Sequence, residues 1–253
     1  MRSTVVAALV MAMATAAGCS LSSPTSPPLR PLGEASESAS YVFRYAAGDG
    51  VDAAWQQAFH DWAVAALQVS VPERVTYNKY LSRTHMGDLT GHYTTNGFAE
   101  PEQMALHTLW RRDNHEPVHV YSARFGSPVA LFNEGLAVAF QVDPVAGDFV
   151  PRWSGTPIHD LARQFRQQNR LIPLGALLAT DDFRKADSNL TYPEAGSFIR
   201  YMLDVYGLEA IKRLFQRGNP ADSADAVRQQ FFAVYGRSIA DVERDWWALL
   251  DRR

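Results

Sequence analysis

His115-Glu116-Pro117-Val118-His119 is the stretch that decides how this chain folds, because it fits the pattern HExxH. On a helix, two histidines four residues apart project from the same face, and the glutamate between them can serve as a general base. Proteins use this arrangement to hold a zinc ion. The sequence therefore predicts that His115 and His119 are metal ligands and that Glu116 is a catalytic base.

A third ligand is predicted at Glu134, within the segment Asn133-Glu134-Gly135-Leu136-Ala137. The surrounding residues are apolar at helical spacing, and a lone carboxylate there is costly unless a cation neutralises it. In a catalytic zinc site, three protein ligands hold the ion and water takes the fourth position. We therefore expect Zn2+ as the cofactor, bound by His115, His119 and Glu134.

Pro117 lies inside the motif and limits where the helix can begin. Proline is tolerated in the first turn of a helix, but it costs about 3 kcal/mol in the helix interior. Asp113 is of a residue type that caps helix N-termini. The sequence therefore predicts a helix that begins at about Asp113, with Pro117 in or just beyond its first turn.

The N-terminus has the pattern of an export signal. Arg2 precedes an apolar run from Val5 to Ala17, which is too short to span a bilayer comfortably. The run leads to Cys19, the only cysteine in the chain. Residues 1–18 are therefore predicted to be a signal peptide. The end of this segment resembles the lipobox of bacterial lipoproteins, in which the cysteine carries a diacylglycerol.

The resemblance to lipoprotein signals implies a location. It implies an exported protein that is lipid-anchored through Cys19, and Ser20 implies the periplasmic face of the outer membrane. Residues 19–40 are rich in serine and proline and have few large apolar side chains, so we expect a disordered tether. A plain secreted protein and an uncleaved anchor are the alternatives to lipidation.

Composition places the rest of the chain among globular proteins. The chain has 253 residues, of which 47% are hydrophobic, so it can bury a sizeable core. Its formal net charge is −3, which provides no strongly basic surface, and we therefore do not expect nucleic acid as a partner. The expected partners are a peptide or protein substrate and a membrane reached through the N-terminal lipid.

Hydrophobic periodicity divides residues 41–253 into two halves. Residues 41–142 combine helical stripes with strand-like alternation. The predicted strands cover residues 41–45, 74–80 and 103–110. Residues 143–253 have helical periodicity, and one of their helices is predicted to begin at Pro193. We therefore expect an α+β fold, with a small mixed half that contains the HExxH helix, an all-helical half, and a binding cleft between them.

The two metal segments also resemble a known group of enzymes. HEPVH followed by NEGLA resembles the gluzincin metallopeptidases, and NEGLA is close to the NEGFA-type segment of aminopeptidases in that clan. Further similarity, to bacterial peptidase-MA-like proteins, lies in YPEAGSFIRY at 192–201, the Tyr-Gly pairs at 206–207 and 235–236, and DVERDW at 241–246. The resemblance implies a thermolysin-like fold, zinc on the three ligands and Glu116 as the base.

The resemblance further implies that the strand at 103–110 is an edge strand on which an extended peptide adds. At one position the chain departs from the thermolysin type, because Val138 stands where an Asp supports the ligands in those enzymes. The support must then come from elsewhere. Tyr192, at the predicted start of a helix, is the candidate donor to the developing oxyanion, and a half-buried packing role is its alternative.

Two functions from different classes fit these residues. The first is a zinc-dependent peptidase of the bacterial cell envelope, in which a metal-activated water attacks the peptide bond and Glu116 takes its proton. The second is a lipoprotein that keeps the gluzincin scaffold as a peptide-binding or envelope-assembly module with weak or no turnover. Glu116 favours the enzyme, because a binding module has no need of a glutamate that binds no metal. Hydrolysis of a non-peptide amide or ester is a third, weaker possibility.

Overall fold

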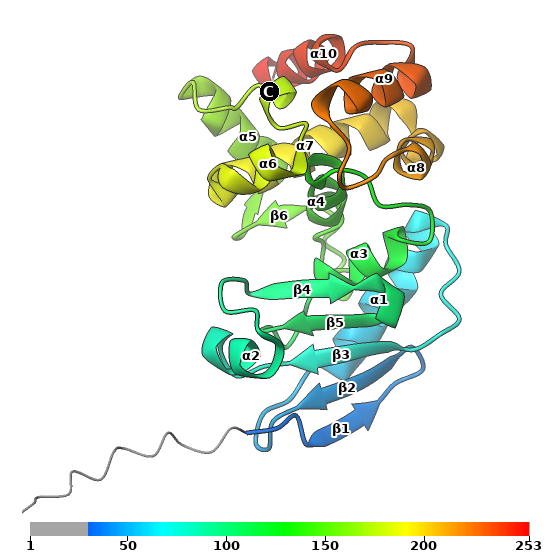
Figure 1. Ribbon diagram of the computed structural model, residues 1–253, viewed down its shortest axis with the longest axis vertical. Coiled ribbons are helices and arrows are strands. Elements are labelled where there is room, and N and C mark those ends of the chain that lie inside the picture. Colours follow the sequence, from blue (N-terminus) through cyan, green and yellow to red (C-terminus); the bar gives the residue numbers. More distant parts are fainter. Residues whose placement is uncertain (1–29, 253) are drawn as a thin grey trace, which may run out of the picture.

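A computed structural model describes residues 30–252, so the predicted signal peptide and Cys19 lie outside the described residues. The described chain is mixed α and β, as predicted. A sheet with its helices forms one end of the molecule, and a group of helices forms the other (Figure 1). Within residues 30–252, no helix has both the length and the apolar character needed to cross a membrane.

The main sheet has the strand order β1-β2-β3-β5-β4. Its three inner strands run parallel to one another and are β2 (Tyr41–Tyr45), β3 (Val75–Lys79) and β5 (Ala105–Thr108). These strands confirm the predictions at 41–45 and 74–80. The strand predicted at 103–110 is also present, but it is shorter than expected. The outer strands pair antiparallel with their neighbours and are β1 (Glu34–Glu37) and β4 (Gly97–Glu100).

Both outer strands differ from the sequence-based expectations. β1 lies inside the segment 19–40, so the prediction of a disordered tether is wrong for residues 34–37, which obtain their backbone hydrogen bonds by pairing with β2. The prediction that the strand at 103–110 is an edge is also wrong. β5 lies between β3 and β4, and β4 is one of the two edge strands of the sheet that the described residues form, the other being β1. Strand order follows from long-range pairing, which local alternation does not encode.

Two helices cover one face of the sheet. α1 (Ala53–Leu67) and α3 (Glu116–Ser122) pack against each other and against the face that carries Tyr41. The Tyr41 hydroxyl is hydrogen-bonded to that of Tyr121 on α3 and accepts a hydrogen bond from Gln56 on α1. The helix that carries HExxH is therefore fixed to the sheet from two sides.

The remaining elements lie mostly in the C-terminal part. The helices are α2 (Arg83–Thr90), α4 (Ala130–Ala139), α5 (Ile158–Gln167), α6 (Thr180–Lys185), α7 (Ser188–Tyr206), α8 (Leu208–Arg217), α9 (Ala224–Tyr235) and α10 (Ile239–Asp251). The short elements are the 3-10 helices η1 (Pro101–Gln103) and η2 (Leu174–Ala176) and the strands β6 (Arg152–Trp153) and β7 (Thr156–Pro157). The half predicted to be all-helical thus also contains a small β6-β7 hairpin.

α4 and α7 cross at close range. A Cβ atom on Gly135 would lie 2.9 Å from the carbonyl oxygen of Ala195, and one on Gly196 would lie 2.3 Å from Cγ1 of Val138. Only glycine leaves room for such a contact. α4, which the sequence places in the first half, is therefore joined by packing to the helices of the second half (Figure 1).

The start of α7 corrects another prediction. The helix begins at Ser188, five residues before the expected start at Pro193, because the Asp187 carboxylate caps its first turn and accepts a hydrogen bond from the backbone N–H of Asn189 at 3.0 Å. Pro193 lies inside the helix, where its ring removes one backbone hydrogen bond. Tyr192 is therefore a residue of the helix body and not its first residue.

Candidate metal centre

The N-terminus of α3 is held in place by α1. The Gln56 side chain of α1 donates to the carbonyl oxygen of Asp113 at 2.8 Å and accepts from the Asp113 N–H at 3.0 Å. The Asp113 carboxylate in turn accepts from the backbone N–H groups of His115 (2.8 Å) and Glu116 (3.0 Å). Asp113 thus accepts hydrogen bonds just before α3, but the predicted start at about Asp113 is three residues early, because the N-cap is His115 and α3 begins at Glu116, with Pro117 in its first turn.

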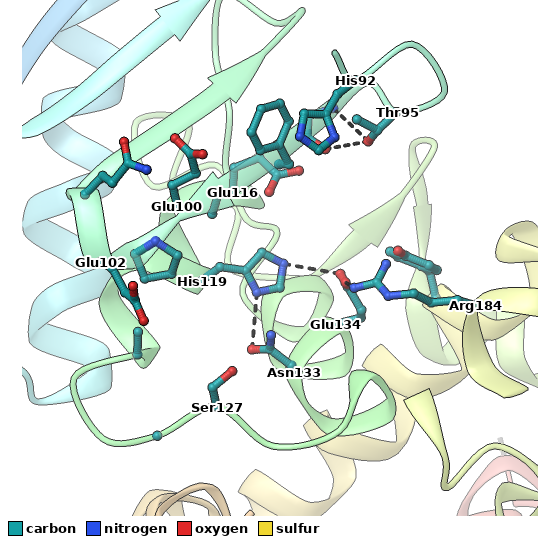
Figure 2. A pocket seen from close by; sticks show the side chains of 18 residues that line it. His92, Thr95, Glu100, Glu102, Glu116, His119, Ser127, Asn133, Glu134 and Arg184 are labelled. Atoms are coloured by element: carbon teal, nitrogen blue, oxygen red, sulfur yellow. Dashed lines mark hydrogen bonds and ion pairs between the residues drawn. The ribbon is translucent and has the colours of Figure 1, made fainter. Parts of the chain in front are cut away.

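The three predicted ligands converge on one point. His115 Nε2 and His119 Nε2 each lie 3.2 Å from the same oxygen, Oε2 of Glu134, and 3.3 Å from each other. Their side chains are largely buried, with exposed fractions of 15%, 10% and 7%. These three residues form a group that could hold a metal ion. Figure 2 shows His119 and Glu134 facing each other from α3 and α4.

The free imidazole nitrogens have neighbours that sequence reasoning missed. His119 Nδ1 lies 3.3 Å from Oδ1 of Asn133, which can accept its proton (Figure 2). His115 Nδ1 lies 3.2 Å from Nε2 of Gln141, whose Oε1 is buried without a hydrogen-bond partner. Turning this amide by 180° would bring its oxygen to His115 as an acceptor. A proton on Nδ1 leaves Nε2 free to bind a cation. Asn133 and Gln141 are thus the side chains that lie beside the two Nδ1 atoms.

Arg184 holds the second oxygen of the carboxylate ligand. Its Nη2 donates to Oε1 of Glu134 at 3.0 Å, while Oε2 faces the histidines. The arginine comes from α6, 50 residues further along the chain. No sequence pattern pointed to it, because a contact between two helices at this separation follows only from how they pack.

The charges of the ligands are coupled. Burial would favour neutral His119, but the charge and hydrogen bond of Glu134, together with Glu116 and Asn133, outweigh it and raise the pKa of His119 to about 9. Although burial opposes it, the same pairing holds the pKa of Glu134 well below its usual range. A cation that binds His119 must displace the proton, so its binding releases a proton to solvent.

Glu116 lies beside the ligands, against β4. A Cβ atom on Gly97 would lie 2.7 Å from Oε1 of Glu116, so the absence of a side chain at this position makes room for the carboxylate. Burial raises the pKa of the Glu116 carboxyl to about 7, against the opposing effect of His115 and His119. A carboxyl that titrates near neutrality can both accept and return a proton.

Tyr192 is brought to the same site. Its ring stacks on that of His115, with the ring centroids 6.1 Å apart, and also contacts Trp153 and Phe183. Burial and the nearby Glu134 charge raise the pKa of its hydroxyl, which therefore keeps its proton at neutral pH. The hydroxyl can donate a hydrogen bond, and the aromatic contacts fit the packing role as well.

A cavity of about 820 Å³ opens over these residues. One wall follows β4 and η1, from Gly97 to Gln103, and the opposite wall comes from α4, α6 and α7 through Asn133, Arg184 and Tyr192. Glu116, His119 and Glu134 lie on its inner surface (Figure 2). The cleft expected between the two halves is therefore present, and His119 and Glu134 of the metal group line it.

No family model matches this chain, and no curated protein matches it either.

Proposed function

We propose that this protein is a zinc-dependent peptidase with a thermolysin-like fold, in which Glu116 is the general base. The observation that carries the proposal is the spacing of the ligand atoms, which lie 3.2, 3.2 and 3.3 Å from one another. Tetrahedral zinc with bonds of about 2.0–2.1 Å requires its ligand atoms to be about 3.3–3.4 Å apart. Two imidazoles and one carboxylate are also a donor set of catalytic zinc sites.

The surrounding side chains fit hydrolysis of an amide bond. Zinc held by these ligands lowers the pKa of a bound water to about 7 and supplies a nucleophile at neutral pH. Glu116 accepts the proton of that water and returns it to the leaving amine. The Tyr192 hydroxyl donates a hydrogen bond to the oxygen that becomes negative. Asn133 and Gln141 keep the two histidines in the tautomer that binds a cation.

A peptide is the substrate that the cavity fits best. β4 is one of the two edge strands of the described sheet, and it forms one wall of the cavity. An extended peptide can add to such an edge through its own backbone hydrogen bonds, which places a peptide group beside the metal group. This edge is β4, not the strand at 103–110. The alternative, a binding module without turnover, would use the same edge and is separated from the enzyme by the activity test.

The test of the proposal is a joint measurement of metal and turnover. Protein purified without chelators should contain about one zinc per chain and should cleave a mixture of unstructured peptides. Treatment with a chelator should abolish cleavage, and one equivalent of zinc should restore it. Protein that binds zinc but cleaves no peptide would favour the binding module, and a chain without zinc would exclude the zinc-dependent peptidase.

Asn133→Ala should weaken zinc binding. The substitution removes the acceptor beside Nδ1 of His119 and leaves the ligand itself in place, so we expect a loss of about 10–100-fold in zinc affinity. Competition with a chromophoric chelator measures this affinity. Asn189→Ala, an exposed asparagine at the start of α7, is the matched control and should leave the affinity unchanged. Equal affinity in both variants would mean that Asn133 does not support His119.

The proposed location rests on the N-terminal sequence alone. We propose that Cys19 carries a lipid that anchors the protein to a bacterial membrane, with the periplasmic face of the outer membrane as its site. Cys19→Ser should then move the protein from the membrane fraction to the soluble fraction, because the thiol that carries the lipid is absent. Unchanged membrane retention of this variant would contradict lipidation at Cys19.

A further inference from the structure

Arg184 places a positive charge at the cavity wall, beside the candidate metal group. One nitrogen of its guanidinium bonds Glu134 at 3.0 Å, yet the side chain is 56% exposed and lines the cavity. It also lies next to the Tyr192 hydroxyl. A residue that only supported Glu134 could do so from a buried position, whereas Arg184 is open to whatever enters the cavity.

Once a divalent cation is bound, the charges of the ion and of Arg184 exceed those of the two carboxylates beside them by one. The carboxylates of Glu134 and Glu116 offset the two charges of such an ion. In the protein alone, Glu134 already lies 3.2 Å from His119 Nε2 as well as 3.0 Å from Arg184. Arg184 then provides one surplus positive charge close to the ligands. A planar guanidinium in this position is suited to a carboxylate, which it can bind through two hydrogen bonds.

The acidic residues of the cavity are gathered away from Arg184. Glu100 on β4 and Glu102 on η1 lie on one side of His119, and Arg184 lies on the other (Figure 2). Glu100 faces His107 at 3.0 Å, and burial lowers the pKa of that histidine, so its positive charge at neutral pH is small. A carboxylate on a bound molecule is therefore repelled from the Glu100 side and attracted to the Arg184 side.

The direction of β4 agrees with this separation of charge. The strand runs from Gly97 to Glu100, so its C-terminal end is the acidic one. A peptide that pairs antiparallel with β4 runs the opposite way, and its C-terminal end points away from Glu100. Thr95, just before the strand, lies on the same side of His119 as Arg184 (Figure 2). The C-terminal part of such a peptide would thus approach the guanidinium.

We propose that Arg184 determines substrate specificity by binding a carboxylate on the C-terminal side of the cleaved bond. The inference rests on the proposed peptidase function, which it deepens by naming the substrate class. The carboxylate has two possible sources: the free C-terminus of a short peptide, or an Asp or Glu side chain next to the cleaved bond. Both present the same group to the guanidinium.

The experiment measures binding, so that it does not depend on turnover. In a zinc-loaded Glu116→Gln background, calorimetry compares acetyl-trialanine as the free acid with the same peptide as its C-terminal amide. We expect the acid to bind about 10–100-fold more tightly than the amide. An amidated peptide that ends in Asp identifies the source: tight binding points to side-chain carboxylates as well, and weak binding points to the C-terminus.

Substitution of Arg184 should remove the preference. In Arg184→Gln the affinity ratio of acid to amide should fall to about 1. In Arg184→Lys the ratio should be intermediate, because lysine keeps the charge but lacks the planar guanidinium that forms two hydrogen bonds to a carboxylate. The ratio is taken within one protein, so a uniform effect of weaker zinc binding cancels. Lys185→Gln is the matched control, because it removes the same charge from the next residue, whose side chain is 75% exposed, and it should keep the full ratio.

The outcomes separate this inference from the peptidase function. A ratio of 1 in the Glu116→Gln background, or an undiminished ratio in Arg184→Gln, would overturn the role of Arg184. The rate at which the wild type cleaves both peptides is measured in parallel. A carboxylate preference without any cleavage would support carboxylate binding by Arg184 and contradict the peptidase function. Cleavage without a preference would support the peptidase function and contradict the role of Arg184.

Discussion

Glu116→Gln is expected to lower peptide turnover by about 10²–10⁴-fold while zinc binding persists, because the amide has the shape of the carboxylate but cannot accept a proton. Glu116 is not one of the three residues that converge on the metal position, and its carboxylate rests against the backbone of Gly97. The substitution therefore removes a proton acceptor and leaves the ligands in place. Metal analysis and initial rates on the same sample check both parts.

The control for this variant is Glu209→Gln, which changes an exposed carboxylate on α8 far from the cavity. It should retain both zinc and turnover. If Glu116→Gln kept its zinc and cleaved peptides at the full rate, Glu116 would not be the general base. If it lost zinc instead, the carboxylate would be needed to hold the ion, and the separation of roles between Glu116 and the ligands would be wrong.

Glu134→Ala should abolish both stoichiometric zinc and turnover. The substitution removes the only oxygen ligand of the group, so the loss of affinity should exceed the roughly 10–100-fold expected for a supporting residue such as Asn133. It also leaves Arg184 without its partner, and two histidines face each other with no carboxylate between them. Chelator competition gives the affinity, and the rate of peptide cleavage gives the turnover.

Glu134→Asp is the informative companion variant, because it keeps the charge and shortens the side chain by one methylene. We expect zinc affinity and turnover between those of the wild type and of Glu134→Ala. Unfolding curves of the zinc-free proteins show whether either variant has lost its fold. A folded Glu134→Ala protein that still bound one zinc tightly would show that the third ligand is another residue.

The placement of Glu116 and the placement of Glu134 depend on different parts of the fold. Glu116 is positioned from the sheet side, by Asp113 at the start of α3 and by Gly97 on β4. Glu134 is positioned from the helical side, because α4 crosses α7 at Gly135, the next residue, and α6 supplies Arg184. The candidate site therefore exists only when the two parts of the molecule are packed together.

The sequence by itself determined the features that depend on local geometry. The period of the helix places His115 and His119 on one face, whatever the rest of the chain does. The tolerance of proline in a first turn is also local, and the structure confirms it, although the helix begins three residues after the expected start at Asp113. The three inner strands could be predicted from the alternation of their side chains, because this alternation is also a local property of the sequence.

Only the tertiary structure decided the features that depend on distant residues. The sheet order placed β4, and not the strand predicted at 103–110, at an edge of the sheet, and pairing with β2 ordered residues 34–37, which their composition predicted to be part of a disordered tether. Arg184 reached Glu134 across 50 residues of chain, and Gln141 reached His115 across 26. Such contacts are set by how whole elements pack, and packing energies are summed over many residues far apart in sequence, so no local pattern could encode them.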